Sequence, residues 1–298
     1  MIEAVEGYLE MRRLLRYRDH DLARDLRRFA HDAAVEGHRF LDNEFVRAWV
    51  LSTRGRFRKA TLFYNLRHLG LYLRAEDDRH EVLPEFFGET RQSRSKQPYI
   101  YDQSEIAALM QWLANEPKVE PWNAHTYSTV VGLLAATGMR LGETVALDLA
   151  DVRPDHLLVT HGKFGKQRQV FIDITTSAAL RGYVRARPRD ASTGALFVTT
   201  AGKRVRRIAM ELHFRTATRA LGIQGRDDTS LPRLHDLRHT FAVRSLEACG
   251  FDGKAVSAHV VALSVHLGHV SLRSTFWYLR STFEMKQRVA QAMEAARA

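Results

Sequence analysis

Five polar residues, most of them in the last third of the chain, have side chains that could act together on one substrate. Arg140 comes first, His235 and Arg238 lie in one short stretch, and His269 and Tyr278 follow. A tyrosine phenol has a pKa of about 10 and becomes a useful nucleophile only where cations stabilise its anion. Arginine carries its charge permanently, and its planar guanidinium binds two oxygens of one phosphate. These residue types therefore indicate phosphoryl transfer, with Arg140 and Arg238 as the phosphate clamp.

Each of these residues also has an ordinary structural explanation when it is taken alone. Arg140 follows a glycine at the end of an apolar helix, where Glu143 could orient it or form a surface salt bridge with it. His235 and Arg238 have the i, i+3 spacing of one helix face, at an N-terminus that favours anions. Tyr278 lies between two apolar residues and could be a core aromatic. Only the whole set indicates chemistry.

A metal site is the less favoured interpretation of the histidines. His235 and His239 are four residues apart, as in zinc-binding helices, but the glutamate that such a motif needs is Asp236 here. His239 could equally pack in the core. We therefore expect no metal and no cofactor.

Two lysines are candidates for a proton donor. Lys163 and Lys166 lie in a basic turn between two stretches, 156–160 and 169–173, that read as short strands of a hairpin. A partly desolvated ammonium in that turn could protonate a leaving oxygen, although a turn lysine is ordinarily just solvated. The residues alone leave the choice between the two open.

Composition places the chain among ordinary globular proteins. It has 298 residues, of which 45% are hydrophobic and 27% charged, which is enough for two domains with cores of their own. No apolar run approaches the roughly 18 residues that a membrane span needs. The single cysteine excludes an internal disulfide and fits a reducing compartment. We expect a cytoplasmic, nucleoid-associated protein.

The net charge of +11 favours a polyanionic partner such as double-stranded DNA. Residues 1–100 contribute 19 − 16 = +3, and residues 101–298 contribute 26 − 18 = +8. The excess is spread over both parts, as expected if both face one duplex.

Residues 1–90 predict a small domain of four or five helices. Apolar residues recur there every three to four positions, and residues 42–44 have the composition of a helix start. Seven arginines between residues 12 and 28 form either a solvated helix face or a phosphate-binding face. We expect DNA contacts more from a second group of basic residues and from the linker that follows, namely Arg54, Arg56, Arg58, Lys59, Arg91, Arg94 and Lys96.

Residues 91–98 are polar, basic and end in proline, which is typical of an interdomain linker. The second domain, 99–298, opens with a helix capped by Asp102 or Ser104, and a longer apolar helix follows from about 124 to 137. Apart from the hairpin, helices dominate to the end. A last helix from about residue 282 could pack in cis or dock on a neighbouring protomer.

The ordered motifs resemble those of the tyrosine recombinases, which include phage integrases, Xer-like resolvases and transposon-borne recombinases. The resemblance runs over roughly residues 98–284, through the sequences TGMRLGE from Thr137, GKFGKQR from Gly162, HDLRHTFA from His235, LGH from Leu267 and the closing Tyr278. It implies a mainly α fold with a small antiparallel sheet. It also implies two domains, a helical, SAM-like DNA-clamping domain and a catalytic domain.

The resemblance implies a role for each candidate residue. Arg140 and Arg238 bind the scissile phosphate, Glu143 supports Arg140, and Tyr278 attacks to give a 3′-phosphotyrosyl bond. His269 hydrogen-bonds a phosphate oxygen, and His235 helps to move the tyrosine proton. Lys163 protonates the departing 5′ oxygen. Phe164 stands where the family often has glycine, which keeps Lys166 in play.

The expected function is site-specific DNA recombination by a homo-tetramer on two duplexes, with or without related recombinases. The alternatives are DNA relaxation like that of a type IB topoisomerase, and a catalytically silent DNA-binding regulator. A silent regulator would be expected to lose Arg140, Arg238 or Tyr278, and all three are present.

Overall fold

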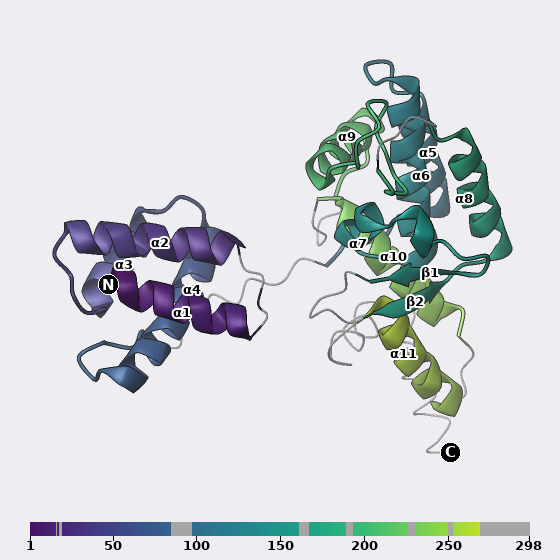
Figure 1. The fold of residues 1–298 in the computed structure, drawn as a ribbon. Helices are drawn as coiled ribbons and strands as arrows, with labels where there is room; N and C mark the ends of the chain where they lie inside the picture. The colour runs from purple at the N-terminus through teal and green to yellow at the C-terminus, as the bar shows by residue number, and fades with distance from the viewer. Residues whose placement is uncertain are drawn as a thin grey trace. The chain divides into compact units, whose positions relative to one another are not determined.

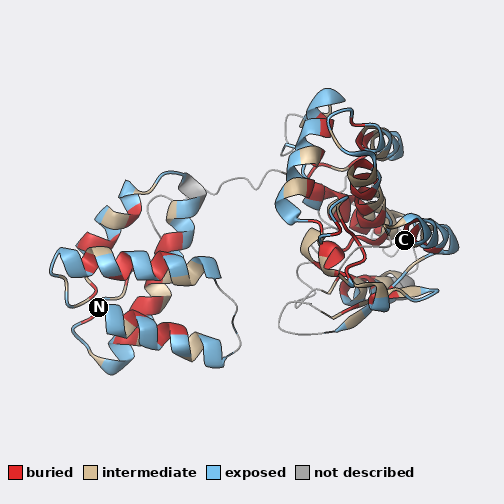
Figure 2. Ribbon diagram, turned by 45° about the horizontal axis from the view of Figure 1, so that its top comes forward, coloured by how far each residue is buried: buried red, intermediate tan, exposed pale blue. Residues whose placement is uncertain are grey.

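The computed structural model describes residues 1–15, 17, 20–84, 97–160, 167–188, 193–225, 231–249 and 253–268. The contacts between Cα atoms divide the chain into two compact units, Met1–Arg94 and Ser95–Ala298. Each unit has its own buried interior, as the red segments of Figure 2 show. We describe the two units separately.

The first unit is a bundle whose described residues contain four helices (Figure 1): α1 (Ile2–Leu14), α2 (His20–Val35), α3 (Asn43–Ser52) and α4 (Arg56–Glu76). α1 packs along α2, and α4 contacts the other three helices. Apolar side chains such as Leu26, Phe29 and Leu66 form a continuous core, as the three-to-four-residue spacing predicted.

The start of α3 follows the predicted capping chemistry. Asp42 is the N-cap, and its carboxylate accepts a hydrogen bond of 2.7 Å from the backbone N–H of Phe45. Only three residues separate α3 from α4, and Gly55 ends that turn with a positive φ of 92°. The glycine therefore permits the tight connection that brings the second basic group to the start of α4.

The described part of the second unit contains eight helical segments and one strand pair: α5 (Gln103–Ala114), α6 (Pro121–Thr137), α7 (Leu141–Ala146), the 3-10 helix η1 (Leu149–Asp151), β1 (His156–Val159), β2 (Arg168–Phe171), α8 (Ile174–Ala186), α9 (Arg207–Ala220), α10 (Leu234–Glu247) and α11 (Gly253–Leu267). The mainly helical fold with a small antiparallel sheet is therefore confirmed.

α6 is the central helix of this unit. It packs against α5, α7, α8 and α10, and nine of its residues are buried. It begins at Pro121, three residues before the predicted start, because proline at the first helical position already has the required φ and needs no backbone donor. α5 begins after Asp102, which forms a capping box with Glu105.

β1 and β2 pair antiparallel, with Val159 opposite Arg168. β2 packs against α11, and α11 packs against α10 through a small apolar cluster that includes Leu246 and Leu263. This packing brings the first residue of β2, the last turn of α11 and the end of α6 to one place (Figure 1).

Candidate active site

A glycine turn at the end of α6 leads the chain into Arg140. Gly138 has a positive φ of 63°. A Cβ atom there would lie 2.5 Å from Cδ1 of Phe241 and 3.0 Å from Cδ2 of Leu267. Only glycine fits this turn, because both the backbone conformation and the space exclude a side chain. Arg140 follows two residues later, directly before α7.

Arg140 is held by a buried carboxylate and by the end of α11. Its Nη1 donates to Oε1 of Glu143 at 2.9 Å, and its Nη2 donates to the carbonyl of Gly268 at 3.2 Å. Glu143 is buried, so this pair is not the surface salt bridge that the sequence left open. The Arg140 side chain keeps 34% of its surface exposed, which leaves it accessible to a ligand.

Arg238, on α10, is almost fully enclosed. It is 2% exposed, and it donates from Nη1 to the carbonyl of Gly138 at 2.9 Å and from Nη2 to the carbonyl of Leu267 at 2.7 Å. Nη1 of Arg140 approaches the same Leu267 oxygen at 3.5 Å. The two predicted clamp arginines, 98 residues apart in sequence, therefore reach one acceptor atom.

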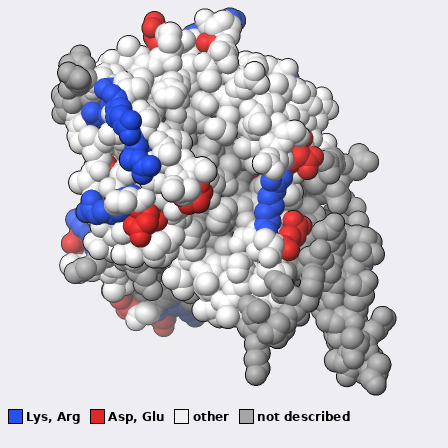
Figure 3. All heavy atoms as spheres, turned by 90° about the vertical axis from the view of Figure 1, so that its right-hand side faces the viewer, with Lys and Arg blue, Asp and Glu red and all other residues white. Residues whose placement is uncertain are grey.

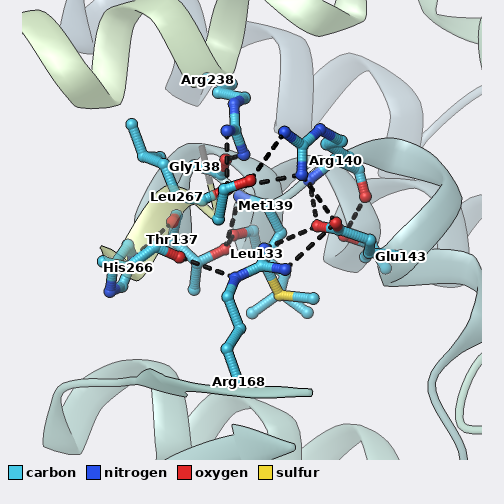
Figure 4. A network of polar contacts seen from close by, with 12 residues as sticks. Leu133, Thr137, Gly138, Met139, Arg140, Glu143, Arg168, Arg238, His266 and Leu267 are labelled. Carbon is cyan, nitrogen blue, oxygen red and sulfur yellow. Dashed lines mark hydrogen bonds and ion pairs between the residues drawn. The ribbon is translucent and has the colours of Figure 1, made fainter. Parts of the chain in front are cut away.

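The last carbonyls of α11 hold these cations together (Figure 4). Carbonyls at a helix C-terminus lack partners within the helix and carry partial negative charge, so they favour guanidinium donors. Three successive carbonyls accept from three arginines at 2.9, 2.7 and 3.2 Å: His266 from Arg168, Leu267 from Arg238, and Gly268 from Arg140.

Glu143 is shared between two of these arginines. Arg168 donates from Nη1 to Oε1 at 3.1 Å and from Nη2 to Oε2 at 2.7 Å, while Arg140 donates to Oε1. Burial by itself raises the pKa of Glu143, but the hydrogen bonds and charges of Arg168 and then of Arg140 outweigh it and lower that pKa below its usual value. The carboxylate is therefore ionised at neutral pH and fixed between two cations.

His235 lies in the first turn of α10, and its ring meets that of His239 edge to face at 4.9 Å between centroids. Desolvation, followed by the charges of Arg238, Arg233 and Arg140, lowers the pKa of His235 to about 4. The residue keeps exposed surface, and the three neighbouring guanidiniums disfavour a further positive charge on its ring. The imidazole is neutral at pH 7 and can accept a proton.

His235 also lines a cavity of about 740 Å³ between α9 and the entry to α10. Three arginines contribute to the same lining, namely Arg215, Arg219 and Arg233. Glu211 also lines the cavity, so the charged side chains around this opening sum to a positive charge, which favours an anionic ligand there.

Four of the predicted site residues lie outside the residues that the structure describes: Lys163, Lys166, His269 and Tyr278. The chain order gives their attachment points. Lys163 and Lys166 belong to the connection between β1 and β2, and His269 directly follows Gly268. The described structure thus brings Arg140, Glu143, His235 and Arg238 together, and the other four stay predictions.

The predicted DNA contacts of the first unit are described only in part. Arg54 is exposed, Lys59 is half-buried, and Nη2 of Arg58 pairs with the buried Asp25 at 2.6 Å. The side chain of Arg56 and the whole of Arg91, Arg94 and Lys96 lie outside the described residues. Arg58 therefore has a structural partner that the sequence did not indicate.

Charged side chains of both signs share the face of the molecule in Figure 3. Blue groups there lie next to red ones, and neutral surface separates the charged groups on the left of the view from those on the right. The net positive charge of the described residues is therefore not gathered into one patch on this face.

The sequence did not indicate a role for Arg168, although its hydrogen bonds connect β2 to Glu143 and to the end of α11. Its position at a strand start, two residues after Lys166, carries no periodic signal of burial or pairing. The one available indication was its place in the motif stretch GKFGKQR.

Comparison with known proteins gives a family match over most of the second unit. The model of the phage integrase family matches residues 100–285. A putative integrase/recombinase of Sinorhizobium fredii, y4rB, is 31% identical over 306 residues, which cover 98% of this chain and 96% of that protein. The tyrosine recombinase XerC of Roseiflexus castenholzii is 36% identical over about half of each protein.

Solved structures extend the likeness of the fold to both units. The Tn1549 transposon integrase, in complex with transposon right end DNA, is matched over 99% of each chain with a TM-score of 0.69 and 15% identity. A lambda integrase dimer bound to a core site is matched over 93% of this chain and 94% of that chain, with a TM-score of 0.63 and 14% identity. Within the described residues, no helix combines the length and the apolar character that a membrane crossing demands.

Proposed function

Because this chain belongs to the phage integrase family of tyrosine site-specific recombinases, we propose that it breaks and rejoins DNA through a 3′-phosphotyrosyl intermediate on Tyr278. The family and the class of enzyme, which the motifs indicated, are confirmed by the family match and by the full-length relative. The phosphotyrosyl step and the role of each residue are the proposal.

The observation that supports it most is the meeting of Arg140 and Arg238 at one oxygen. Both guanidiniums approach the carbonyl of Leu267, at 3.5 and 2.7 Å. Two guanidiniums that reach one acceptor are close enough to bind adjacent oxygens of one phosphate. Arg140 is partly exposed, so a phosphate can approach it from solvent. The pair supplies the fixed positive charge that a pentacoordinate phosphorus requires.

The reaction that follows exchanges one phosphoester for another. The phenolic oxygen of Tyr278 attacks the scissile phosphorus in line, a P–O bond to Tyr278 forms, and the P–O bond to the 5′ oxygen breaks. Neutral His235 accepts the phenolic proton, since its lowered pKa keeps the imidazole unprotonated at pH 7. Lys163, or Lys166 in its place, gives a proton to the 5′ oxygen, and His269 hydrogen-bonds a phosphate oxygen.

Rejoining is the same reaction in reverse, with a 5′ hydroxyl as the nucleophile and Tyr278 as the leaving group. The energy of the broken phosphodiester is kept in the phosphotyrosyl ester. The proposed reaction therefore needs neither ATP nor a metal ion.

The proposed substrate is double-stranded DNA, and the biological act is integration, excision or transposition. Strand exchange needs two duplexes, so we expect four copies of the chain to assemble around them, alone or with related recombinases. Residues 282–298 have apolar positions at helical spacing and would either pack in cis or dock on a neighbouring copy. We expect the protein in the cytoplasm, on the nucleoid.

The test of the nucleophile uses DNA with the native recombination site and a nick that traps the cleaved strand. The wild-type chain should form a protein–DNA adduct that resists denaturant, and Tyr278→Phe should form none while binding the DNA with unchanged affinity. An adduct that persists with Tyr278→Phe would refute the assignment. Exchange of strands between two separate sites, compared with relaxation of one supercoiled plasmid, distinguishes a recombinase from a topoisomerase.

A further inference from the structure

Arg168 is the first residue of the short strand β2, and its side chain is largely buried and held by several hydrogen bonds. Its side chain is 11% exposed, and all three guanidinium nitrogens donate hydrogen bonds. Nη1 and Nη2 grip the two oxygens of Glu143, and Nε donates to the carbonyl of His266 at 2.9 Å. β2 is thereby tied both to α7 and to the end of α11 (Figure 4).

Gly268 leaves room for the guanidinium of Arg168 because it has no side chain. It has a positive φ of 67°, and a Cβ atom on it would lie 2.9 Å from Nη1 and 3.0 Å from Cζ of Arg168. The guanidinium therefore lies directly against the backbone turn that ends α11. In the sequence, His269 directly follows this glycine.

Glu143 transmits the position of Arg168 to Arg140. Its Oε1 accepts from both arginines, and its Oε2 accepts from Nη2 of Arg168 and from the backbone N–H of Arg140 at 3.2 Å. A carboxylate that is hydrogen-bonded to two guanidiniums cannot shift toward one without loosening the other. Among the described residues, loss of Arg168 would leave Glu143 held by the side chain and the backbone N–H of Arg140.

Arg168 also closes the base of the hairpin. It is the first residue of β2 and lies opposite Val159, the last residue of β1. The connection that carries Lys163 and Lys166 begins and ends at this pair. One side chain thus anchors the strand that follows both lysines to the carboxylate that orients Arg140.

We propose that Arg168 is a positioning residue of the recombinase reaction, which sets Arg140 against the scissile phosphate through Glu143. This inference rests on the proposed function. Arg168 itself is not a phosphate ligand in this proposal, because the carboxylate of Glu143 accepts from both of its Nη groups and neutralises its charge, whereas the Nη groups of Arg238 donate to neutral carbonyls. Its removal should therefore slow cleavage without weakening DNA binding.

The experiment measures single-turnover adduct formation on the nicked site by the full chain and by its Arg168→Gln variant. Two substrates are compared, a phosphodiester and a methylphosphonate at the scissile position. The methylphosphonate lacks the negative charge that Arg140 neutralises, so the orientation of Arg140 matters less on it. Arg168→Gln should slow cleavage of the phosphodiester about 10²-fold, since a displacement of about 1 Å in a site can have that effect. The defect should shrink on the methylphosphonate.

Arg204 provides a matched control in the same unit. It also joins a carboxylate, that of Asp148, to backbone carbonyls, those of Val145 and Leu147. Arg204→Gln should cleave both substrates at close to the wild-type rate. DNA affinity and melting temperature are measured for every variant. If Arg168→Gln does not fold, Arg168→Lys replaces it, because lysine keeps the charge beside Glu143 but lacks the two-pronged grip.

The outcomes separate this inference from the function on which it rests. A wild-type chain that forms no adduct contradicts the proposed function. A wild-type adduct whose rate is unaffected by loss of Arg168 contradicts only the positioning role. An equal defect of Arg168→Gln on both substrates also contradicts the positioning role, since a misplaced Arg140 would affect the charged phosphodiester more. A loss of DNA affinity that accounts for the slower cleavage contradicts it as well.

Discussion

Two arginine–glutamate pairs of the first unit differ sharply in burial from the pair that holds the candidate site of the second unit. In the first unit, Arg13 pairs with Glu10 and Arg27 pairs with Glu6, and all four side chains are between 46% and 69% exposed. In the second unit, Arg168 is 11% exposed and pairs with a Glu143 side chain that is 6% exposed. The residue type and the partner type are the same, and burial differs.

The difference in burial determines whether an arginine supplies only charge or a guanidinium in a fixed position. Exposed ion pairs contribute only about 0–1 kcal/mol each and exchange readily with water and salt, so Arg13 and Arg27 are not fixed in one geometry by their partners. Removing arginine from water is costly unless nearly all its donors are used. The network around Glu143 and the end of α11 meets that condition. It fixes guanidinium positions, which is what phosphate chemistry needs.

Replacing a buried arginine by lysine should have the largest effect. Arg238→Lys keeps the charge, but one ammonium cannot reproduce the planar fork that reaches both Gly138 and Leu267. We expect adduct formation to fall by about 10²–10³-fold. The free energy of unfolding should fall by about 1–3 kcal/mol, because a buried carbonyl loses its donor. Arg204→Lys is the control and should lower cleavage little. Both variants are measured by adduct formation and by thermal melting. If the two variants lose the same fraction of cleavage activity, the fixed position of Arg238 is not what the reaction requires.

A glycine substitution should have an intermediate effect. Gly268→Ala adds a methyl group 2.9 Å from Nη1 of Arg168, at a φ of 67°. Gly222→Ala is the control, since Gly222 has nearly the same φ, 64°, and nothing within 4 Å of its added Cβ. Both variants should lower the free energy of unfolding by about 1 kcal/mol, because alanine is strained in the left-handed conformation. Gly268→Ala should lower it further, and it alone should slow cleavage.

Denaturant unfolding and adduct assays on the two alanine variants check this. If Gly268→Ala cleaves as fast as Gly222→Ala, the close packing of the turn against Arg168 does not matter for the reaction.

Substitutions in the first unit should have the smallest effect on the cleavage rate. We expect Arg54→Gln and Lys59→Gln to weaken DNA binding, and each to reduce the slope of log affinity against log salt by about 1 if its side chain neutralises one phosphate. The cleavage rate at saturating DNA should not change. Titrations at several salt concentrations, with Arg79→Gln as a control whose partner is the nearby Asp77, measure the slope. An unchanged slope would show that these residues do not bind phosphate.

Much of the fold was readable from local sequence because helices and caps depend on neighbouring residues. The cap at Asp42 and the glycine after α6 lie where residue type placed them, and the two strands pair as predicted, although β2 runs over Arg168–Phe171 and not over 169–173. The start of α6 was placed too late because the proline signal at Pro121 was not used.

The sequence predicted which residues belong to the candidate site, but not how they are buried or which distant residues they contact. Arg140 and its helix-start partner Glu143 were paired by spacing, and their ion pair is present. The burial of Glu143, the pairing of Arg58 with Asp25 and the role of Arg168 were not visible, because each depends on packing between elements distant in sequence.

The sequence by itself determined which chemical groups are present, their order and the secondary structure that carries most of them. The tertiary structure alone decided that the carbonyls ending α11 hold Arg140 from 128 residues away and Arg238 from 29 residues away. The physical reason is that a helix end leaves its last carbonyls without internal partners, and only folding determines which cations come within reach of them.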